Sequence, residues 1–160
     1  MADKKLTDLA AATSLALTDI LLVTKSPGGA AASNKVTVST LLNTTAWTDY
    51  SATSTIVGWS SFTIKNIYYK KIGTLVFCSF ALQGVSNSTT TTFTLPDVVN
   101  AAAFNMTVPL YAGDNSVQVS TAIAFLTAGS ATIACYPTGA GGGWTASNTK
   151  SVRGQFFYEV

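Results

Sequence analysis

Histidine is absent from the 160 residues of this chain, and its absence removes several kinds of chemistry together. Histidine is the usual general base near neutral pH, the partner of nucleophilic serine and cysteine, and a common metal ligand. We therefore expect no Ser-His or Cys-His enzyme, no metal site and no bound cofactor. The expected function is binding or assembly, not catalysis.

Charged side chains are also scarce, at 10% of the residues, against about 25% in a typical soluble domain. The nine Lys and Arg residues are scattered along the chain, and the formal net charge is only +2. A nucleic-acid-binding domain carries a basic patch or stripe, so nucleic acid is not an expected partner. A surface of Thr, Ser and Asn side chains suits a sugar or another protein better.

Long apolar runs are missing as well. No run approaches the roughly 20 residues that a membrane-spanning helix needs, and the first residues are polar, without the apolar segment of a secretory signal. We expect no membrane insertion, and a protein made in the cytoplasm without signal-dependent export.

Acidic residues number seven in the whole chain. A pair of carboxylates can hydrolyse a glycosidic bond without histidine. A glycan-degrading enzyme is therefore kept as a third alternative, and Asp97, Asp114 and Glu159 are the residues that would carry it.

Cysteine occurs twice, as Cys78 and Cys135, each within an expected strand. Two thiolates cannot complete a zinc site without histidine. We interpret both residues as reduced, buried thiols that pack as small apolar side chains. A disulfide between them is the alternative.

Alternation of apolar and polar residues with a period of two dominates the sequence after residue 54 and predicts β-strands. Val76, Cys78, Phe80 and Leu82 share one face of an expected strand, and residues 152–160 alternate in the same way up to the end of the chain. One long strand is expected over 117–126. Shorter strands are expected over residues 66–72, 91–95, 107–111 and 131–136, and turns at 72–74, 84–88, 112–115, 128–130 and 139–143.

Six or more strands with short turns and no long helix predict an all-β fold, an antiparallel β-sandwich or jelly-roll-like head domain over residues 46–160. Residues 1–45 form an expected attachment segment with short strands at 19–24 and 35–38, followed by one helical turn capped by Ser39. Because so short a pair of strands is marginal alone, we expect it to pair with a neighbour. Apolar residues on both faces of several strands, such as Phe77 and Phe157, predict oligomerisation.

The chain resembles phage tail-fibre and related virion appendage proteins in two regions. The first quarter carries Leu6-Thr7-Asp8-Leu9 and Asp19-Ile20-Leu21-Leu22-Val23, then a Pro-Gly turn and Lys35-Val36-Thr37-Val38. The remainder carries the strings Gly58-Trp59-Ser60-Ser61-Phe62-Thr63, Ile67-Tyr68-Tyr69-Lys70-Lys71-Ile72-Gly73 and Val152-Arg153-Gly154-Gln155-Phe156-Phe157.

The resemblance implies a homotrimeric virion protein, assembled in the host bacterial cytoplasm, whose N-terminal segment binds another protein of the tail or capsid. The residues expected to make that attachment are Leu9, Leu15, Ile20, Leu22, Val36 and Leu41. The chain departs from most tail fibres because a short polar stretch, not a long shaft, joins the two regions. A capsid decoration or head-fibre protein with a purely structural role is therefore the alternative.

The leading hypothesis is a short tail fibre or spike whose β-sandwich head contacts the host surface through a glycan. The residues proposed to bind that glycan are Trp144, Asn148, Tyr136 and Trp59. An aromatic face beside amides and hydroxyls suits a sugar ring. The alternative for the two tryptophans is that they plug the ends of the sandwich, since tryptophan is usually largely buried.

Overall fold

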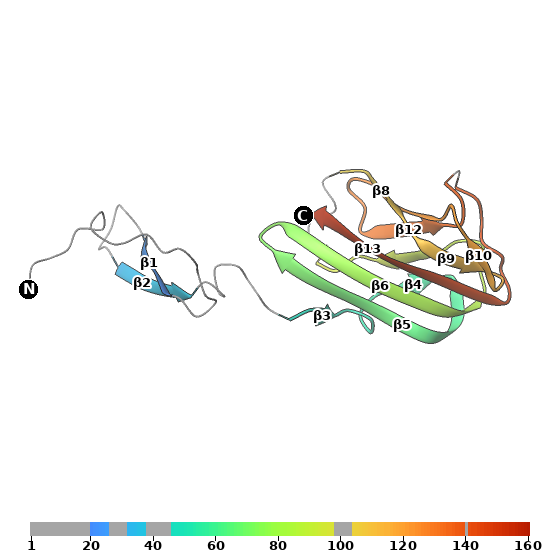
Figure 1. The fold of residues 1–160 in the computed structure, drawn as a ribbon, viewed down its shortest axis with the longest axis horizontal. Helices are drawn as coiled ribbons and strands as arrows, with labels where there is room; N and C mark the ends of the chain where they lie inside the picture. Colours follow the sequence, from blue (N-terminus) through green and yellow to red (C-terminus); the bar gives the residue numbers. More distant parts are fainter. Residues whose placement is uncertain (1–19, 26–31, 38–45, 98–103, 140) are drawn as a thin grey trace, which may run out of the picture. The chain divides into compact units, whose positions relative to one another are not determined.

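The computed structural model describes residues 20–25, 32–37, 46–97, 104–139 and 141–160. Within these residues the regular structure consists of strands, with no helix (Figure 1). None of the described segments therefore offers a helix long and apolar enough to cross a membrane. The chain divides into two units, Met1–Thr44 and Thr45–Val160.

The N-terminal unit contains a β-hairpin. Strands β1 (Ile20–Lys25) and β2 (Ala32–Thr37) pair antiparallel, with Leu21 opposite Val36 and Leu22 opposite Lys35. Both short strands expected here are therefore present. The expected helical turn from Ser39 and the proposed attachment residues Leu9, Leu15 and Leu41 lie outside the described residues.

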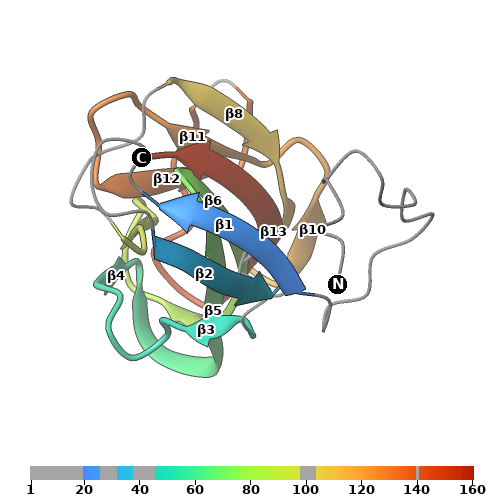
Figure 2. The same cartoon turned by 90° about the vertical axis from the view of Figure 1, so that its left-hand side faces the viewer.

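The C-terminal unit is an antiparallel β-sandwich, as predicted (Figures 1 and 2). One sheet has six strands in the order β10-β9-β13-β6-β5-β3, and the other has five in the order β4-β7-β12-β11-β8. The strands of the six-stranded sheet are β3 (Thr48–Asp49), β5 (Trp59–Ile72), β6 (Leu75–Ser86), β9 (Tyr111–Asp114), β10 (Val117–Val119) and β13 (Thr149–Glu159). The strands of the five-stranded sheet are β4 (Ile56–Val57), β7 (Thr92–Thr94), β8 (Met106–Pro109), β11 (Ile123–Leu126) and β12 (Thr132–Tyr136).

The three longest strands, β5, β6 and β13, form the centre of the six-stranded sheet. β5 and β6 are joined at Gly73, whose φ of 61° is a left-handed conformation that glycine adopts without a steric cost. β6 then pairs with β13 from Val85 opposite Thr149 to Leu75 opposite Glu159. This continuous pairing gives the domain a long, rigid platform.

The core lies between the two sheets and follows the predicted alternation. Val76, Cys78, Phe80 and Leu82 of β6 are all at most 3% exposed, so the predicted inward face is confirmed. Three aromatic rings connect the sheets: Phe93 of β7 lies 4.9 Å from Phe80 and 6.5 Å from Phe156 of β13, measured between ring centroids. Such tilted ring pairs add to the free energy gained by burial.

The long strand expected over 117–126 is wrong, because the chain changes sheets within it. β10 belongs to the six-stranded sheet and β11 to the five-stranded sheet, with a turn at Ser120 and Thr121 between them. Val119 packs against the core before the turn, whereas the buried residues after it are Ala122, Ala124 and Leu126. A single strand would have kept the same alternate positions buried throughout.

Two expected turns are also wrong in their bounds. β6 continues through Gly84 to Ser86, so the range 84–88 begins within a strand. β9 continues through Gly113 to Asp114, so most of the range 112–115 is strand. The turn between β9 and β10 falls at Asn115 and Ser116, both with positive φ, 51° and 65°. Two consecutive positive φ values are typical of the tightest hairpin turns. The expected strand over 107–111 is likewise divided between β8 and β9.

Gly84 is required by close backbone packing beside the irregular pairing of β5 and β6. A Cβ atom at this position would lie 1.9 Å from the carbonyl oxygen of Ser61. We predict that Gly84→Ala lowers the free energy of unfolding by about 1–3 kcal/mol, the usual cost of overpacking. Gly139→Ala is the matched control, because a Cβ there meets nothing within 4 Å. Urea denaturation of both variants tests this, and equal stabilities would contradict it.

Candidate functional site

The two tryptophans expected to bind a glycan are buried instead. Trp59 is 6% exposed and Trp144 is 3% exposed. Their indole Nε1–H groups donate hydrogen bonds within the domain, from Trp59 to the Lys150 carbonyl oxygen at 3.2 Å and from Trp144 to the Cys135 carbonyl oxygen at 2.7 Å. With both rings enclosed, neither offers a face to a sugar, and the structure favours their interpretation as plugs.

The other two proposed glycan-binding residues do not share a site. Tyr136 lines a groove of about 220 Å³ with residues 89–92 and 141–143. Asn148 instead donates from its side-chain amide to Asn115 Oδ1 at 2.6 Å, in a loop with a positive φ of 61°. The sequence-based site is therefore divided among separate places in the domain.

Trp59 and Trp144 do lie around one residue that the sequence analysis missed. Lys150 is fully buried, with its Nζ 4.7 Å from the Trp59 ring centroid and 5.6 Å from the Trp144 ring centroid. Nζ also donates a hydrogen bond to the Ser88 carbonyl oxygen at 3.2 Å. Attraction between a cation and an aromatic face offsets part of the cost of burying the ammonium group. The sequence did contain a signal for this burial: Lys150 lies two residues before Val152, so the alternation of the strand places both on the same face.

Burial lowers the pKa of Lys150 to about 8, although Asp114 and Cys135 each favour its charged form. Because this pKa lies below the ordinary value of 10.5, the unfolded chain binds more protons between these pH values. The contribution of Lys150 to stability must therefore rise as the pH increases from about 8 to about 10.5.

We predict that the unfolding free energy of the natural protein rises relative to that of Lys150→Met across this pH window. Urea denaturation at a series of pH values measures the difference. Cys78, Cys135 and Tyr158 are present in both proteins, so their own titrations cancel to a first approximation. A difference that stays constant from pH 7 to pH 11 would show that Lys150 does not titrate in this way.

A second candidate site is a polar hollow of about 400 Å³ on the outer face of the six-stranded sheet. We name it the Tyr111–Arg153 hollow. Its lining residues are Gln83, Tyr111, Gly113, Ser116, Val117, Gln118, Thr149, Ser151 and Arg153.

Strand pairing explains the shape of this hollow. Gln118, Gly113, Ser151 and Gln83 are consecutive cross-strand partners on β10, β9, β13 and β6, and all point away from the core. The middle two are small, and a Cβ at Gly113 would lie 2.8 Å from Ser151 Oγ. The floor of the hollow is therefore low, while longer side chains at both ends of the row form its walls.

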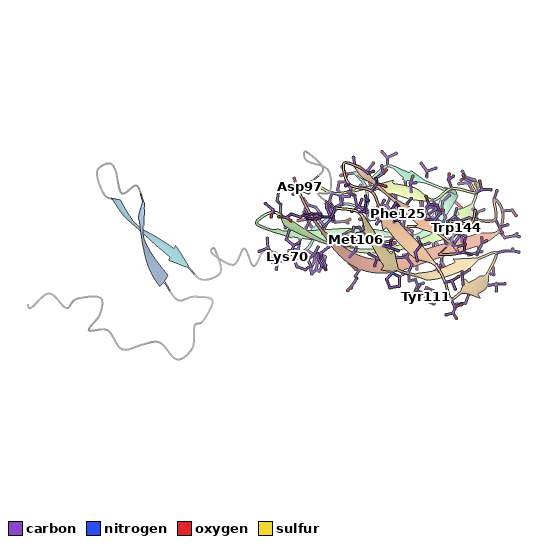
Figure 3. All side chains as sticks on the ribbon, turned by 90° about the horizontal axis from the view of Figure 1, so that it is seen from above. Lys70, Asp97, Met106, Tyr111, Phe125 and Trp144 are labelled. Carbon is purple, nitrogen blue, oxygen red and sulfur yellow. The ribbon has the colours of Figure 1, made fainter. Side chains whose placement is uncertain are left out.

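Tyr111 and Arg153 form the next cross-strand pair along the same face. Tyr111 is 52% exposed, and the Arg153 guanidinium carbon lies 5.7 Å from its ring centroid. Arg153 Nη2 donates a hydrogen bond to Gln83 Oε1 at 3.1 Å. The hollow thus combines an exposed aromatic ring, a cation and several neutral hydrogen-bonding groups. Figure 3 shows Tyr111 toward one end of the sandwich and Lys70 and Asp97 toward the other.

The three carboxylates considered for hydrolysis each bind a different partner. Asp97 forms an ion pair with Lys71, Asp114 accepts hydrogen bonds from the backbone and hydroxyl of Thr145, and Glu159 accepts one from Thr74. None of the three lines the Tyr111–Arg153 hollow or the Tyr136 groove. Among the described residues, no three His, Cys, Asp or Glu side chains gather as a metal site would require.

The two cysteines are free and buried in opposite sheets, Cys78 in β6 and Cys135 in β12. Burial raises the pKa of each thiol to about 12, and nearby Lys150 offsets part of this rise at Cys135. At neutral pH both are protonated and unreactive, because the thiolate is the nucleophilic form. The structure thus favours buried thiols over the disulfide alternative.

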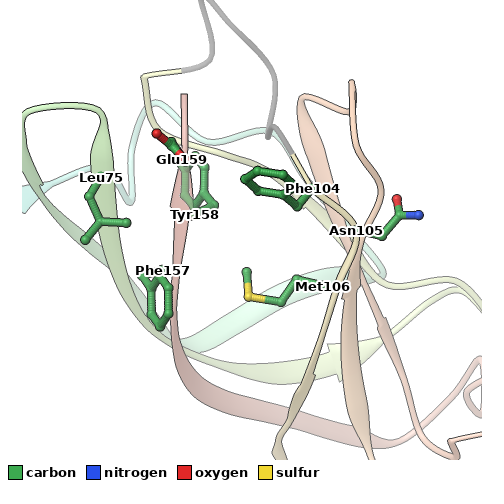
Figure 4. A pocket seen from close by; sticks show the side chains of 7 residues that line it. All are labelled: Leu75, Phe104, Asn105, Met106, Phe157, Tyr158 and Glu159. Carbon is green, nitrogen blue, oxygen red and sulfur yellow. The ribbon is translucent and has the colours of Figure 1, made fainter.

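A third hollow, of about 240 Å³, is mainly apolar and lies beside the last residues of β13 (Figure 4). Figure 4 shows Phe157 and Leu75 on one side of it and Phe104 and Met106 on the other. Phe157 is 55% exposed and its ring centroid lies 6.1 Å from that of Phe77. The surface beside the end of β13 is therefore mainly apolar, whereas the Tyr111–Arg153 hollow is polar.

Comparison with models of known protein families found no match, and comparison with curated proteins found none at the significance required.

Proposed function

We propose that this chain is a non-enzymatic structural protein of a bacteriophage particle, and that its β-sandwich binds a host-surface glycan in the Tyr111–Arg153 hollow. The observation that carries the proposal is the exposed Tyr111 ring beside neutral amide and hydroxyl groups on a rigid sheet. This site replaces the one expected around Trp144 and Tyr136.

The side chains of the hollow match the two surfaces of a sugar. A pyranose ring has an apolar face of C–H groups, which suits the exposed ring of Tyr111. Its rim carries hydroxyl groups, and Gln83, Gln118 and Ser151 supply both donors and acceptors for them. Because paired strands fix the backbone of these residues, no loop has to become ordered on binding.

The other parts of the proposal concern assembly. The N-terminal unit attaches the protein to another virion component, and the sandwich domain assembles as a homotrimer. Support comes from the resemblance of both regions to phage appendage proteins and from the aromatic pair of half-buried Phe77 and exposed Phe157. An apolar surface of this kind is typical of a contact between subunits.

Glycan binding is tested with an array of bacterial surface polysaccharides, followed by calorimetric titration of the best ligand. We predict that Tyr111→Ala weakens binding by about tenfold or more, which corresponds to about 1.4 kcal/mol. Tyr136→Ala is the matched control, since it removes the same side chain from the groove on the other sheet. Loss of binding in the control alone would move the site to that groove.

The position of the chain in the particle distinguishes a receptor-binding fibre from a capsid decoration protein. The short connection between the two regions favours the capsid decoration role, because a fibre usually needs a long shaft. We predict density for this protein at the tail tip in cryo-electron microscopy of the intact virion. Density on the capsid lattice would instead establish the decoration or head-fibre role.

A further inference from the structure

The charge of Arg153 is not neutralised within the Tyr111–Arg153 hollow. Among the described residues, the hollow has no carboxylate in its lining, and the hydrogen-bond partner of Arg153 is the neutral amide of Gln83. Asp114 follows Gly113 on β9, but its carboxylate binds Thr145 and contributes to the environment of buried Lys150. The hollow therefore presents one uncompensated positive charge to a ligand.

From this charge we propose that the hollow selects a sugar that carries a carboxylate, a uronic or sialic acid. The inference rests on the proposed glycan binding and names its ligand class. A neutral sugar accepts hydrogen bonds from a guanidinium group at single hydroxyl oxygens. A carboxylate can accept two parallel hydrogen bonds and also gains the attraction between opposite charges.

The orientation of Arg153 supports recognition of a planar anion. Its guanidinium lies over the Tyr111 ring, with 5.7 Å from the guanidinium carbon to the ring centroid, while Nη2 is held by Gln83 at 3.1 Å. These two contacts restrain the plane of the group and leave its other N–H donors for a ligand. A restrained guanidinium is suited to a carboxylate, which matches it with two parallel hydrogen bonds.

The number of positive charges in the hollow indicates whether its ligand carries a carboxylate or a phosphate. Arg153 is the one cationic residue among those that line it. A sugar phosphate carries close to two negative charges near neutral pH, and sites for it usually combine several cationic or backbone donors. A single guanidinium surrounded by neutral groups is matched by the single negative charge of a carboxylate.

The test uses nuclear magnetic resonance titration of the full chain with glucuronate, galacturonate and N-acetylneuraminate, each beside its carboxyl-reduced form. We expect the natural protein to bind at least one acid about tenfold more tightly than its reduced form. Arg153→Gln should abolish this preference, and increased salt should weaken binding of the acid alone. Lys70→Gln removes a positive charge from the other end of the sandwich and should leave the preference unchanged.

Three results would overturn the inference. If polysaccharides bind but no acid is preferred over its reduced form, the hollow is not selective for carboxylates, although glycan binding stands. If acetate or inorganic phosphate binds as tightly as the acidic sugars, the hollow recognises an anion and not a sugar. If neither the array nor the acids show binding, the proposed glycan-binding function fails as well. Thermal unfolding of Arg153→Gln confirms that this exposed substitution leaves the domain folded.

Discussion

The register between β6 and β13 is the constraint on which the rest of the domain depends. It places Val152 and Phe156 in the core and, by the same alternation, Ser151 and Arg153 on the outer face. A shift of one residue would exchange the two sets, exposing the core and burying a guanidinium group. Core packing and the polar hollow are therefore two results of one pairing, and the free energy that stabilises the core also fixes the geometry of the site.

The same alternation forces the side chain of Lys150 into the interior of the sandwich. Two residues before Val152, the inward position is occupied by a lysine, and the fold accommodates it between two indole rings. The ammonium group has a carbonyl acceptor at Ser88, so its burial is partly offset. Trp59 and Trp144 therefore stabilise a buried charge instead of contacting a ligand, and their Nε1–H groups donate hydrogen bonds to backbone carbonyl oxygens. The exposed aromatic residue in the polar hollow is Tyr111, on the opposite side of the sheet.

The sequence was sufficient to predict the all-β sandwich, the inward face of β6 and the alternation of β13, because alternation within a strand is a local property. It was insufficient where the chain changes sheets at Ser120 and Thr121, since a run of alternating residues does not reveal which partner each half pairs with. The hollow was missed for the same reason. The alternation put Gln83 on the face opposite the core, but its proximity to Arg153 and Tyr111 depends on how β6, β13 and β9 pair, and these strands are far apart in the sequence.

Tryptophan misled the search for a site because its chemistry suits both a sugar and a core. An exposed tyrosine at a strand end carries a weaker signal, and the expected turn over 112–115 hid that β9 begins at Tyr111. The pairing of Asp114 with Val117 and the φ values of Asn115 and Ser116, 51° and 65°, show that the turn falls later.

Two kinds of surface lie along β13, and their separation would make the proposed binding and the proposed assembly compatible. β9 pairs with β13 along Lys150–Arg153, so among the described strands the β13 edge beyond Arg153 has no partner. The exposed Phe157 and the apolar hollow lie along that part of β13, whereas the polar hollow lies along the paired part. A neighbouring subunit that covered the unpaired edge would bury the apolar end, where desolvation is favourable. The polar end would stay open, because covering Arg153 without an anionic partner would carry a desolvation cost.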